Sequence, residues 1–209
     1  MKELRRDYAS RQLNETDADR DPIAQFRAWF DEAVKADIID VNAMSLATAS
    51  ASGEPAVRTV LLKEVDDRGF VFFTHYTSPK GRALDGNPRA ALLFFWPALE
   101  RQIRITGAVS QVPRAESEAY FASRPIDSRW AAWAAPQSEI LPDRVTLESS
   151  FEQVKARFGD DVPCPAEWGG YRVTPELMEF WQGRPGRLHD RLLYTRQADG
   201  TWSRVRLAP

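Results

Sequence analysis

Five short runs of alternating apolar and polar residues follow one another along the chain, and they constrain the fold more than any other feature. Their turn-forming connections, such as Ser52-Gly53 and Asp66-Asp67-Arg68-Gly69, are short. A parallel crossover needs a dozen or more residues, so the runs are expected to pair antiparallel. Five strands within about 70 residues are typical of a small barrel or closed sheet. The predicted strands are 44–49, 56–65, 69–74, 89–96 and 101–112.

Helices are predicted around this strand region. Asp21-Pro22 supplies an N-cap and a first helical residue, and apolar residues follow at helical spacing over 22–36. Ser78-Pro79 predicts the start of a second, short helix. The remaining predicted elements are helices at 113–122, 126–135 and 143–158, and strands at 170–173, 178–182, 188–196 and 202–207. The fold class is therefore α+β, with an antiparallel barrel core; residues 1–20 form a polar, mobile arm and 21–209 one domain.

Composition narrows the possible functions. Cys164 is the single cysteine, so no internal disulfide can form, which suits a reducing compartment. The longest apolar stretch, 90–99, is too short for a bilayer, and MKELRRDY lacks the apolar segment of a signal peptide. We therefore expect a cytoplasmic protein. The net charge of −2 creates no general attraction to nucleic acid.

The basic residues are mostly arginine. Five of the 28 basic residues are Lys, which leaves 23 Arg, a side chain suited to planar recognition of phosphate and carboxylate. A genome that favours Arg codons would produce the same excess, and the excess alone favours that explanation.

Several common sites are excluded. The sequence has no GxGxxG after a strand, no Walker-type loop and no GxSxG elbow. Two His and one Cys cannot assemble a zinc site of the usual spacing. A phosphorylated ligand would therefore have to be held by Arg, Lys, Ser and helix N-termini.

Two segments could supply such groups near the barrel strands. Arg58 and Lys63 differ in parity, so a regular strand would project them to opposite faces, where they could hold two anions or one could be solvated. Lys80 is predicted within the first turn of a helix, where exposed N–H groups favour phosphate. Many helices start with Ser-Pro, so this signal is weak alone.

Two further segments are candidates. Tyr120, Arg124 and Ser128 lie four residues apart, and Pro125 interrupts the helix, so the three are expected to converge around a bend as a phosphate clamp. The alternative is a capped helix end with Arg124 in an ordinary ion pair. GRLHDR at 186–191 would place Arg187, His189 and Arg191 on one face of a strand. That clustering is costly unless the groups meet solvent, acids or a ligand.

The strings VRTVLLK, ERQ, YFASRPIDS, WGGYRV, EFWQG and RLHDR occur in this order, and with them the chain closely resembles the pyridoxine 5′-phosphate oxidase family. The resemblance extends from about Arg5 to the terminal RLAP. It implies an FMN-binding split barrel with a six-stranded antiparallel Greek-key core and surrounding helices. It also implies a homodimer with FMN bound at the subunit interface.

The resemblance also implies roles for individual residues. The residues that match FMN contacts are Arg58, Thr59, Val60, Leu61, Leu62, Lys63, Phe73, Thr74, Lys80, Gln102, Gln137, Ser138, Trp181 and Arg191. Those that match substrate contacts are Arg5, Tyr8, Lys63, Tyr120, Arg124, Ser128, Arg187 and His189. Arg187 and His189 match the catalytic pair beside the flavin, and no metal is implied. The chain departs from the family at Pro79, usually Arg, at Phe73, usually Tyr, and at Asp7, usually Glu.

The implied reaction is FMN-dependent oxidation of pyridoxine or pyridoxamine 5′-phosphate by O2, giving pyridoxal 5′-phosphate and hydrogen peroxide, with ammonia from the amine. It would serve vitamin B6 biosynthesis and salvage. One alternative is a split-barrel flavin reductase or an oxidase of another substrate, which would not need YFASRPIDS and RLHDR. A second alternative is a non-catalytic binder of flavin or B6 phosphate.

Overall fold

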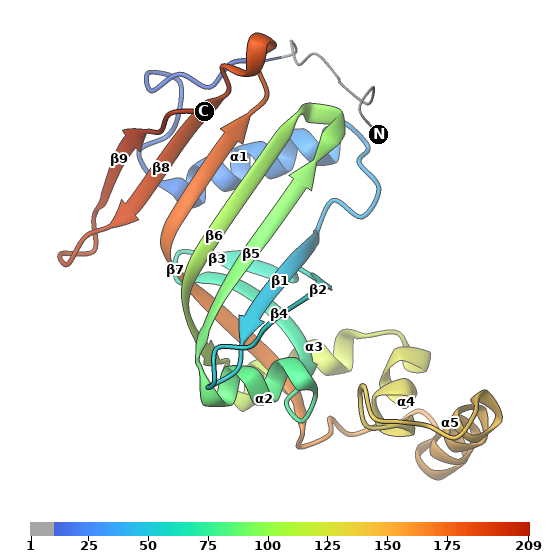
Figure 1. Cartoon of the computed structure of the whole chain (residues 1–209). Coiled ribbons are helices and arrows are strands. Elements are labelled where there is room, and N and C mark those ends of the chain that lie inside the picture. Colours follow the sequence, from blue (N-terminus) through green and yellow to red (C-terminus); the bar gives the residue numbers. More distant parts are fainter. Residues whose placement is uncertain (1–10) are drawn as a thin grey trace.

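A computed structural model describes residues 11–209, which form an antiparallel sheet with helices around it (Figure 1). The helices are α1 (Pro22–Lys35), α2 (Pro79–Gly86), α3 (Arg114–Ser123), α4 (Ile126–Ala134) and α5 (Arg144–Phe158), with short 3-10 turns η1 (Pro97–Leu99) and η2 (Pro185–Arg187). The strands are β1 (Ala43–Ala49), β2 (Pro55–Leu61), β3 (Glu64–Asp66), β4 (Gly69–His75), β5 (Arg89–Trp96), β6 (Arg101–Gln111), β7 (Trp168–Gln182), β8 (Asp190–Arg196) and β9 (Trp202–Arg206).

The sheet curls into an open barrel. Seven strands follow the order β2-β1-β5-β6-β7-β4-β3, and β8 and β9 continue from β7. All pairs are antiparallel, as predicted from the short connections. The α+β split-barrel class is confirmed, although the sheet has nine strands where the resemblance implied a six-stranded core. The difference arises because β3 is separated from β2, and because β8 and β9 extend the sheet as a hairpin.

Strand β7 spans both halves of the barrel. Its first residues pair with β4, from Trp168 to Val173, and its last pair with β8, from Leu177 to Gln182. We predicted two strands here, at 170–173 and 178–182, and the structure corrects this to one. Pro175, which has no N–H, lies where the register with β6 shifts, so the strand continues through an irregularity of the ladder.

The single strand predicted at 56–65 is also corrected, because the chain leaves the ladder after Leu61. The Leu62 N–H donates to the Asn42 carbonyl at 2.8 Å, and the Asn42 amide donates to the Leu62 carbonyl at 3.0 Å. Leu62 is buried in the core, and Leu61 and Lys63 on either side of it are exposed, so the alternation continues although the ladder has ended.

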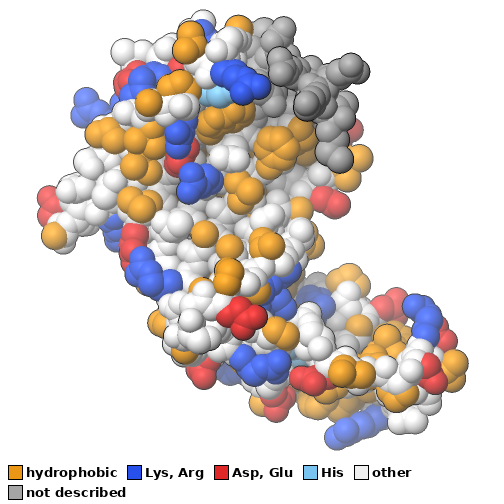
Figure 2. All heavy atoms as spheres, in the orientation of Figure 1, with side chains coloured by type: hydrophobic (Ala, Val, Ile, Leu, Met, Phe, Trp, Pro, Cys, Tyr) orange, Lys and Arg blue, Asp and Glu red, His pale blue; other side chains and the backbone are white. Residues whose placement is uncertain are grey.

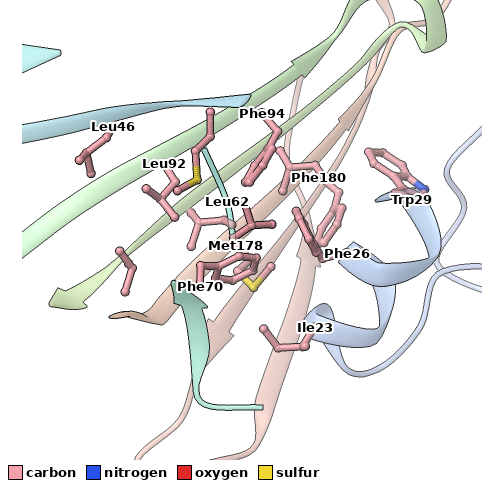
Figure 3. Packing of buried hydrophobic residues seen from close by; sticks show 14 of the residues in the cluster. Ile23, Phe26, Trp29, Leu46, Leu62, Phe70, Leu92, Phe94, Met178 and Phe180 are labelled. Atoms are coloured by element: carbon pink, nitrogen blue, oxygen red, sulfur yellow. The ribbon is translucent and has the colours of Figure 1, made fainter. Parts of the chain in front are cut away.

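Helix α1 covers one face of the sheet and closes the main core. Asp21 caps the helix by accepting a hydrogen bond from the Ile23 N–H at 3.0 Å. Ile23, Phe26 and Trp29 point from this helix into the strands (Figure 3). Phe26 meets Phe70 and Phe94 edge to face at 4.9 and 5.0 Å between ring centroids. Burying such a side chain contributes about 1.5–3 kcal/mol.

Helices α4 and α5 form a lobe that extends from the barrel (Figures 1 and 2). Its apolar side chains belong to a second cluster, which also includes Phe121 of α3 and Trp168 of β7. Within it, Trp130 meets Phe151 edge to face at 6.0 Å. No residue of α5 is fully buried, and hydrophobic side chains are visible on the surface of this lobe (Figure 2). The α3–α4 end of the lobe borders the site described below.

The segment 11–20 packs on the barrel without forming a helix or strand. Leu13 is 4% exposed, and its N–H donates to the Asp190 carboxylate at 3.1 Å. Arg206 forms an ion pair with Glu15 at 2.7 Å. The mobility predicted for 1–20 stays a prediction, and its first ten residues lie outside those the structure describes. No helix in the described part of the chain is long and apolar enough to cross a bilayer.

Candidate functional site

A cavity of about 740 Å³ opens between the barrel and the α3–α4 helices. Its volume falls in the range of pockets that hold small molecules and cofactors. Thirteen of the predicted site residues line it: Arg58, Thr59, Val60, Leu61, Lys63, Phe73, Thr74, Lys80, Tyr120, Arg124, Ser128, Gln137 and Ser138. Pro79, Pro125 and Trp168 complete the lining. Leu62 is not part of it, because that side chain is buried in the core.

Arg58 and Lys63 both line this cavity, and the expectation that they hold two different anions stays a prediction. Strand β2 supplies Arg58 and ends at Leu61, and Lys63 lies in the connection to β3. Arg58 is held by Nη1, which donates to Thr48 Oγ1 at 2.8 Å and to the Leu46 carbonyl at 3.1 Å. Burial lowers the pKa of the Arg58 guanidinium, which nevertheless remains a cation.

Lys80 is a buried cation surrounded by neutral groups. It follows Pro79 in the first turn of α2, which Ser78 caps, as predicted. Its Nζ donates to Gln137 Oε1 at 2.6 Å, to Thr74 Oγ1 at 3.1 Å and to Ser78 Oγ at 3.2 Å. Burial, and then the positive charge of Arg58, lower the pKa of Lys80 to about 8. An anion beside Nζ would relieve both effects.

The three residues of the clamp predicted around Pro125 line the cavity together, and their role as a clamp stays a prediction. Helix α3 ends at Ser123 and α4 begins at Ile126, so Tyr120, Arg124 and Ser128 converge from the two sides of the bend. Arg124 Nη1 is buried and has no hydrogen-bond partner among the described residues. Burial lowers the pKa of Arg124. A buried donor without a partner fits a site that a ligand oxygen completes.

A second group of predicted residues lies at the other end of β7. Gln102 pairs with Trp181, and Trp181 pairs with Arg191 across the next ladder. The rings of Trp181 and His189 lie 4.6 Å apart. Arg191 Nε donates to Glu179 Oε1 at 2.8 Å, an ion pair that raises the pKa of Arg191.

Arg187, His189 and Arg191 do not share a strand face, which corrects that expectation. Pro185 and Gly186 begin the turn η2, and Arg187 ends it with a left-handed φ of 63°. Strand β8 begins only at Asp190. The Arg187–His189 pair therefore belongs to a turn rather than to the sheet.

The hydrogen bonding of His189 defines its neutral tautomer. Its Nδ1 accepts the Arg184 backbone N–H at 3.1 Å, so Nε2 holds the proton of the neutral ring. Burial and then the charge of Arg187 lower the pKa of His189, and Asp190 partly offsets them. His189 is therefore a neutral hydrogen-bond donor at neutral pH.

The two groups are separated along one strand. Trp168 at the cavity and Trp181 at the second group are the first and next-to-last residues of β7. Thirteen residues at about 3.3 Å each correspond to about 40 Å along the strand. One chain therefore does not bring all predicted site residues together. Arg5 and Tyr8 lie outside the described residues.

Trp168 lines the cavity but was not among the predicted site residues. The two glycines that follow it, Gly169 and Gly170, were a signal in the sequence. A side chain at Gly169 would collide with the Tyr76 ring, and one at Gly170 with the Phe73 ring. These collisions indicate that aromatic rings pack closely against the start of β7.

The donors of the cavity fit a phosphorylated cofactor such as FMN. Arg58, Lys63, Lys80 and Arg124 line it together with hydroxyl and amide groups, and no carboxylate is among the described residues that do so. Within residues 11–209, no group of three or more His, Cys, Asp or Glu side chains could hold a metal ion. Fold and site together define an antiparallel split barrel with a cavity whose cationic and hydroxyl donors suit phosphate.

Comparisons with known proteins give the family. The family described as pyridoxamine 5′-phosphate oxidase matches residues 30–158, and the pyridoxine 5′-phosphate oxidase C-terminal dimerisation region matches 168–209. The chain belongs to the pyridoxine/pyridoxamine 5′-phosphate oxidase family, as the resemblance implied. A protein of that name from Thermosynechococcus vestitus is 59% identical over 99% of this chain and 98% of its own length. Another from Ralstonia pickettii is 57% identical over the same shares.

Solved structures support the fold. PhzG from Burkholderia lata, crystallised with tetrahydrophenazine-1-carboxylic acid, is 32% identical with a TM-score of 0.91, over 96% of this chain and 99% of its own. An FMN-binding protein related to pyridoxamine 5′-phosphate oxidase, from Nostoc punctiforme, has a TM-score of 0.72 at 18% identity, over 88% and 97% of the two chains. The second likeness concerns the fold alone.

Proposed function

We propose that this protein oxidises pyridoxine or pyridoxamine 5′-phosphate to pyridoxal 5′-phosphate with FMN as cofactor and O2 as electron acceptor. The observation that most supports this is one cavity with two cationic groups. Arg58 and Lys80 form one group, and Arg124, with Tyr120 and Ser128, forms the other. Two such groups suit two phosphorylated molecules, the cofactor and the substrate. The names of the 59% and 57% identical relatives agree with this reaction.

Arg58, Lys80 and the N-terminus of α2 would hold the FMN phosphate, and Thr74, Gln137 and Ser138 would contact the rest of the cofactor. When bound, FMN supplies the acceptor for the hydride that leaves the substrate's 4′ carbon. Tyr120, Arg124 and Ser128, with Lys63, would bind the substrate phosphate. Binding energy at the phosphate then orients the distant reacting carbon.

We further propose that the protein is a homodimer in which the site is completed by the second copy. The 168–209 match to a dimerisation region supports this, since it contains Trp181, Arg187, His189 and Arg191. Trp181 lies about 40 Å along β7 from Trp168 at the cavity of its own chain, and the other three residues follow it in η2, the next connection and β8. A second copy would bring its Arg187–His189 turn to the open cavity. Arg5 and Tyr8 would contact the substrate as part of a segment that closes over it, in a protein that works in the reducing cytoplasm.

The proposal is tested with FMN-loaded protein mixed anaerobically with pyridoxine 5′-phosphate. Loss of the oxidised-flavin absorbance, its return on admission of air and the appearance of pyridoxal 5′-phosphate are expected. An unchanged spectrum with both B6 phosphates would reject the proposal. Bleaching by NADH or NADPH alone would instead favour a flavin reductase, and absence of any bleaching a non-catalytic binder.

Pro79 provides a prediction about cofactor affinity. It lines the cavity where the family usually has Arg, so one phosphate-binding guanidinium is missing. Pro79→Arg is expected to tighten FMN binding by about 1–3 kcal/mol, the range for a hydrogen bond to a charged group. Titration of apoprotein with FMN by flavin fluorescence measures this. Pro79→Gln serves as the uncharged control, and equal affinities of the Arg variant and the native protein would contradict the prediction.

The tautomer of His189 provides another prediction. Because Nδ1 accepts the Arg184 N–H, Nε2 is the atom that can donate to a substrate oxygen. In His189→Gln the side-chain amide reaches the position of Nε2 and can donate a hydrogen bond there. In His189→Asn the shorter amide reaches only the position of Nδ1. Flavin reduction is expected to slow about 100-fold in the Asn variant, the scale of a lost positioning contact, and clearly less in the Gln variant. Single-turnover reduction rates distinguish them; the reverse order would assign the essential role to Nδ1.

A further inference from the structure

The aromatic face of Trp168 lies against the guanidinium of Arg124, the cation of the clamp formed by Tyr120, Arg124 and Ser128. It is the first residue of β7 and is 4% exposed. The Arg124 guanidinium carbon lies 4.8 Å from the centroid of the Trp168 ring. Phe121 adds a second, more distant ring at 5.6 Å from the same carbon. Arg124 is therefore placed by aromatic faces, which attract a cation without bearing a negative charge.

The Trp168 indole also stacks near Tyr120, a second residue of the clamp. The Tyr120 and Trp168 rings are nearly parallel, at 7° and 6.1 Å between centroids. Phe73 stacks on Tyr120 at 4.0 Å and on Trp168 at 5.4 Å. Phe73 belongs to β4 and Tyr120 to α3, so Trp168 links two elements that contribute to the cavity.

The strand start that bears Trp168 is itself fixed. The Trp168 N–H donates to the Pro165 carbonyl at 3.1 Å, and its carbonyl accepts from Arg114 Nη1 at 3.0 Å. An aromatic support has a specific advantage over a carboxylate partner. A carboxylate would compete with a phosphate for the Arg124 N–H groups, whereas an aromatic face leaves Nη1 available to it.

We infer that Trp168 is a positioning residue that gives the site its selectivity for phosphorylated over unphosphorylated substrate, by holding Arg124 and Tyr120 in place without neutralising the cation. The inference rests on the proposed function, because it assigns the Arg124 clamp to the substrate phosphate. Its readout is the ratio of two affinities, which a general loss of stability would not change.

The test uses two ligands that differ only in the phosphate and cannot be oxidised, 4-deoxypyridoxine 5′-phosphate and 4-deoxypyridoxine. Their affinities for FMN-loaded protein are measured by calorimetry. In Trp168→Leu the preference for the phosphorylated ligand is expected to fall about tenfold, the scale of a desolvated cation–π contact. Trp168→Phe, which keeps an aromatic face, is expected to restore most of it. In turnover, the Leu variant should raise KM for pyridoxine 5′-phosphate with little change in kcat.

Trp130→Leu is the matched control. Trp130 is 8% exposed, belongs to the same aromatic cluster and does not line the cavity. An equal fall in the affinity for both ligands in Trp168→Leu, or the same loss of preference in Trp130→Leu, would overturn the inference. Trp168→Met gives the same comparison should the Leu variant not fold. Wild-type protein that prefers the phosphorylated ligand but never oxidises a B6 phosphate would reject the proposed oxidation and leave the assignment of Trp168 standing.

Discussion

Replacing Arg187 with alanine is expected to slow reduction of the bound flavin by substrate about 100–1000-fold, with little effect on FMN affinity. Arg187 ends the η2 turn two residues before His189, and its positive charge is sufficiently close to lower the pKa of His189. In the proposed dimer this guanidinium is a fixed positive charge beside the reacting end of the substrate. A guanidinium here would stabilise the negative charge that develops on the 4′ oxygen of pyridoxine 5′-phosphate as its proton leaves, so its removal acts on the chemical step.

Anaerobic stopped-flow measurement of flavin absorbance after mixing with pyridoxine 5′-phosphate provides the rate. Arg196→Ala is the matched control, because Arg196 lies at the opposite end of β8, paired with Trp202. It should reduce flavin at the native rate. A native rate in Arg187→Ala, with FMN fully bound, would exclude Arg187 from the reaction.

Lys80→Met is expected to weaken FMN binding about 10–100-fold, the range for hydrogen bonds to a charged group. The ammonium is buried among Thr74, Ser78 and Gln137, none of which neutralises it. A phosphate bound beside this ammonium would interact with a cation that is already removed from water. Methionine keeps the side-chain volume of Lys80 but removes its charge. Lys155→Met, at an exposed position of α5, is the matched control and should bind FMN normally.

The pH dependence tests the same residue. The pKa of Lys80 is lowered to about 8 without ligand, and a bound phosphate raises it. The charged form binds the anion better, so FMN affinity is high below pH 8 and falls as pH rises through about 8. Arg58, the other cation facing Lys80, stays protonated throughout. Fluorescence titrations across this range should show the fall in native protein and none in Lys80→Met; a flat native profile would contradict the lowered pKa.

The sequence predicted the elements well because local signals determined them. Asp21-Pro22 and Ser78-Pro79 begin helices where capping predicts them, and β5 has the predicted bounds 89–96. Pro125 separates α3 from α4, so the bend that brings Tyr120, Arg124 and Ser128 together could also be predicted from the sequence.

The errors arose where a distant contact overrides local periodicity. The pattern of 56–65 predicted one strand, but the Asn42–Leu62 pairing ends the ladder after Leu61. Parity placed Arg187 in a strand that begins only at Asp190. The separation of the cavity from the Trp181 group follows from the length of β7, which the sequence suggested was two strands interrupted at Pro175.

The length of β7 has a genetic consequence. Each chain contributes a cavity at one end of this strand and an Arg187–His189 turn at the other, so in the proposed dimer each site is composed of parts from two gene products. A defect at Lys80 and a defect at Arg187 then damage different halves. A mixed dimer of the two defective chains contains one doubly damaged site and one assembled wholly from native parts. Two inactive alleles of this gene, expressed together, should therefore complement each other, whereas two alleles damaged in the same half should not.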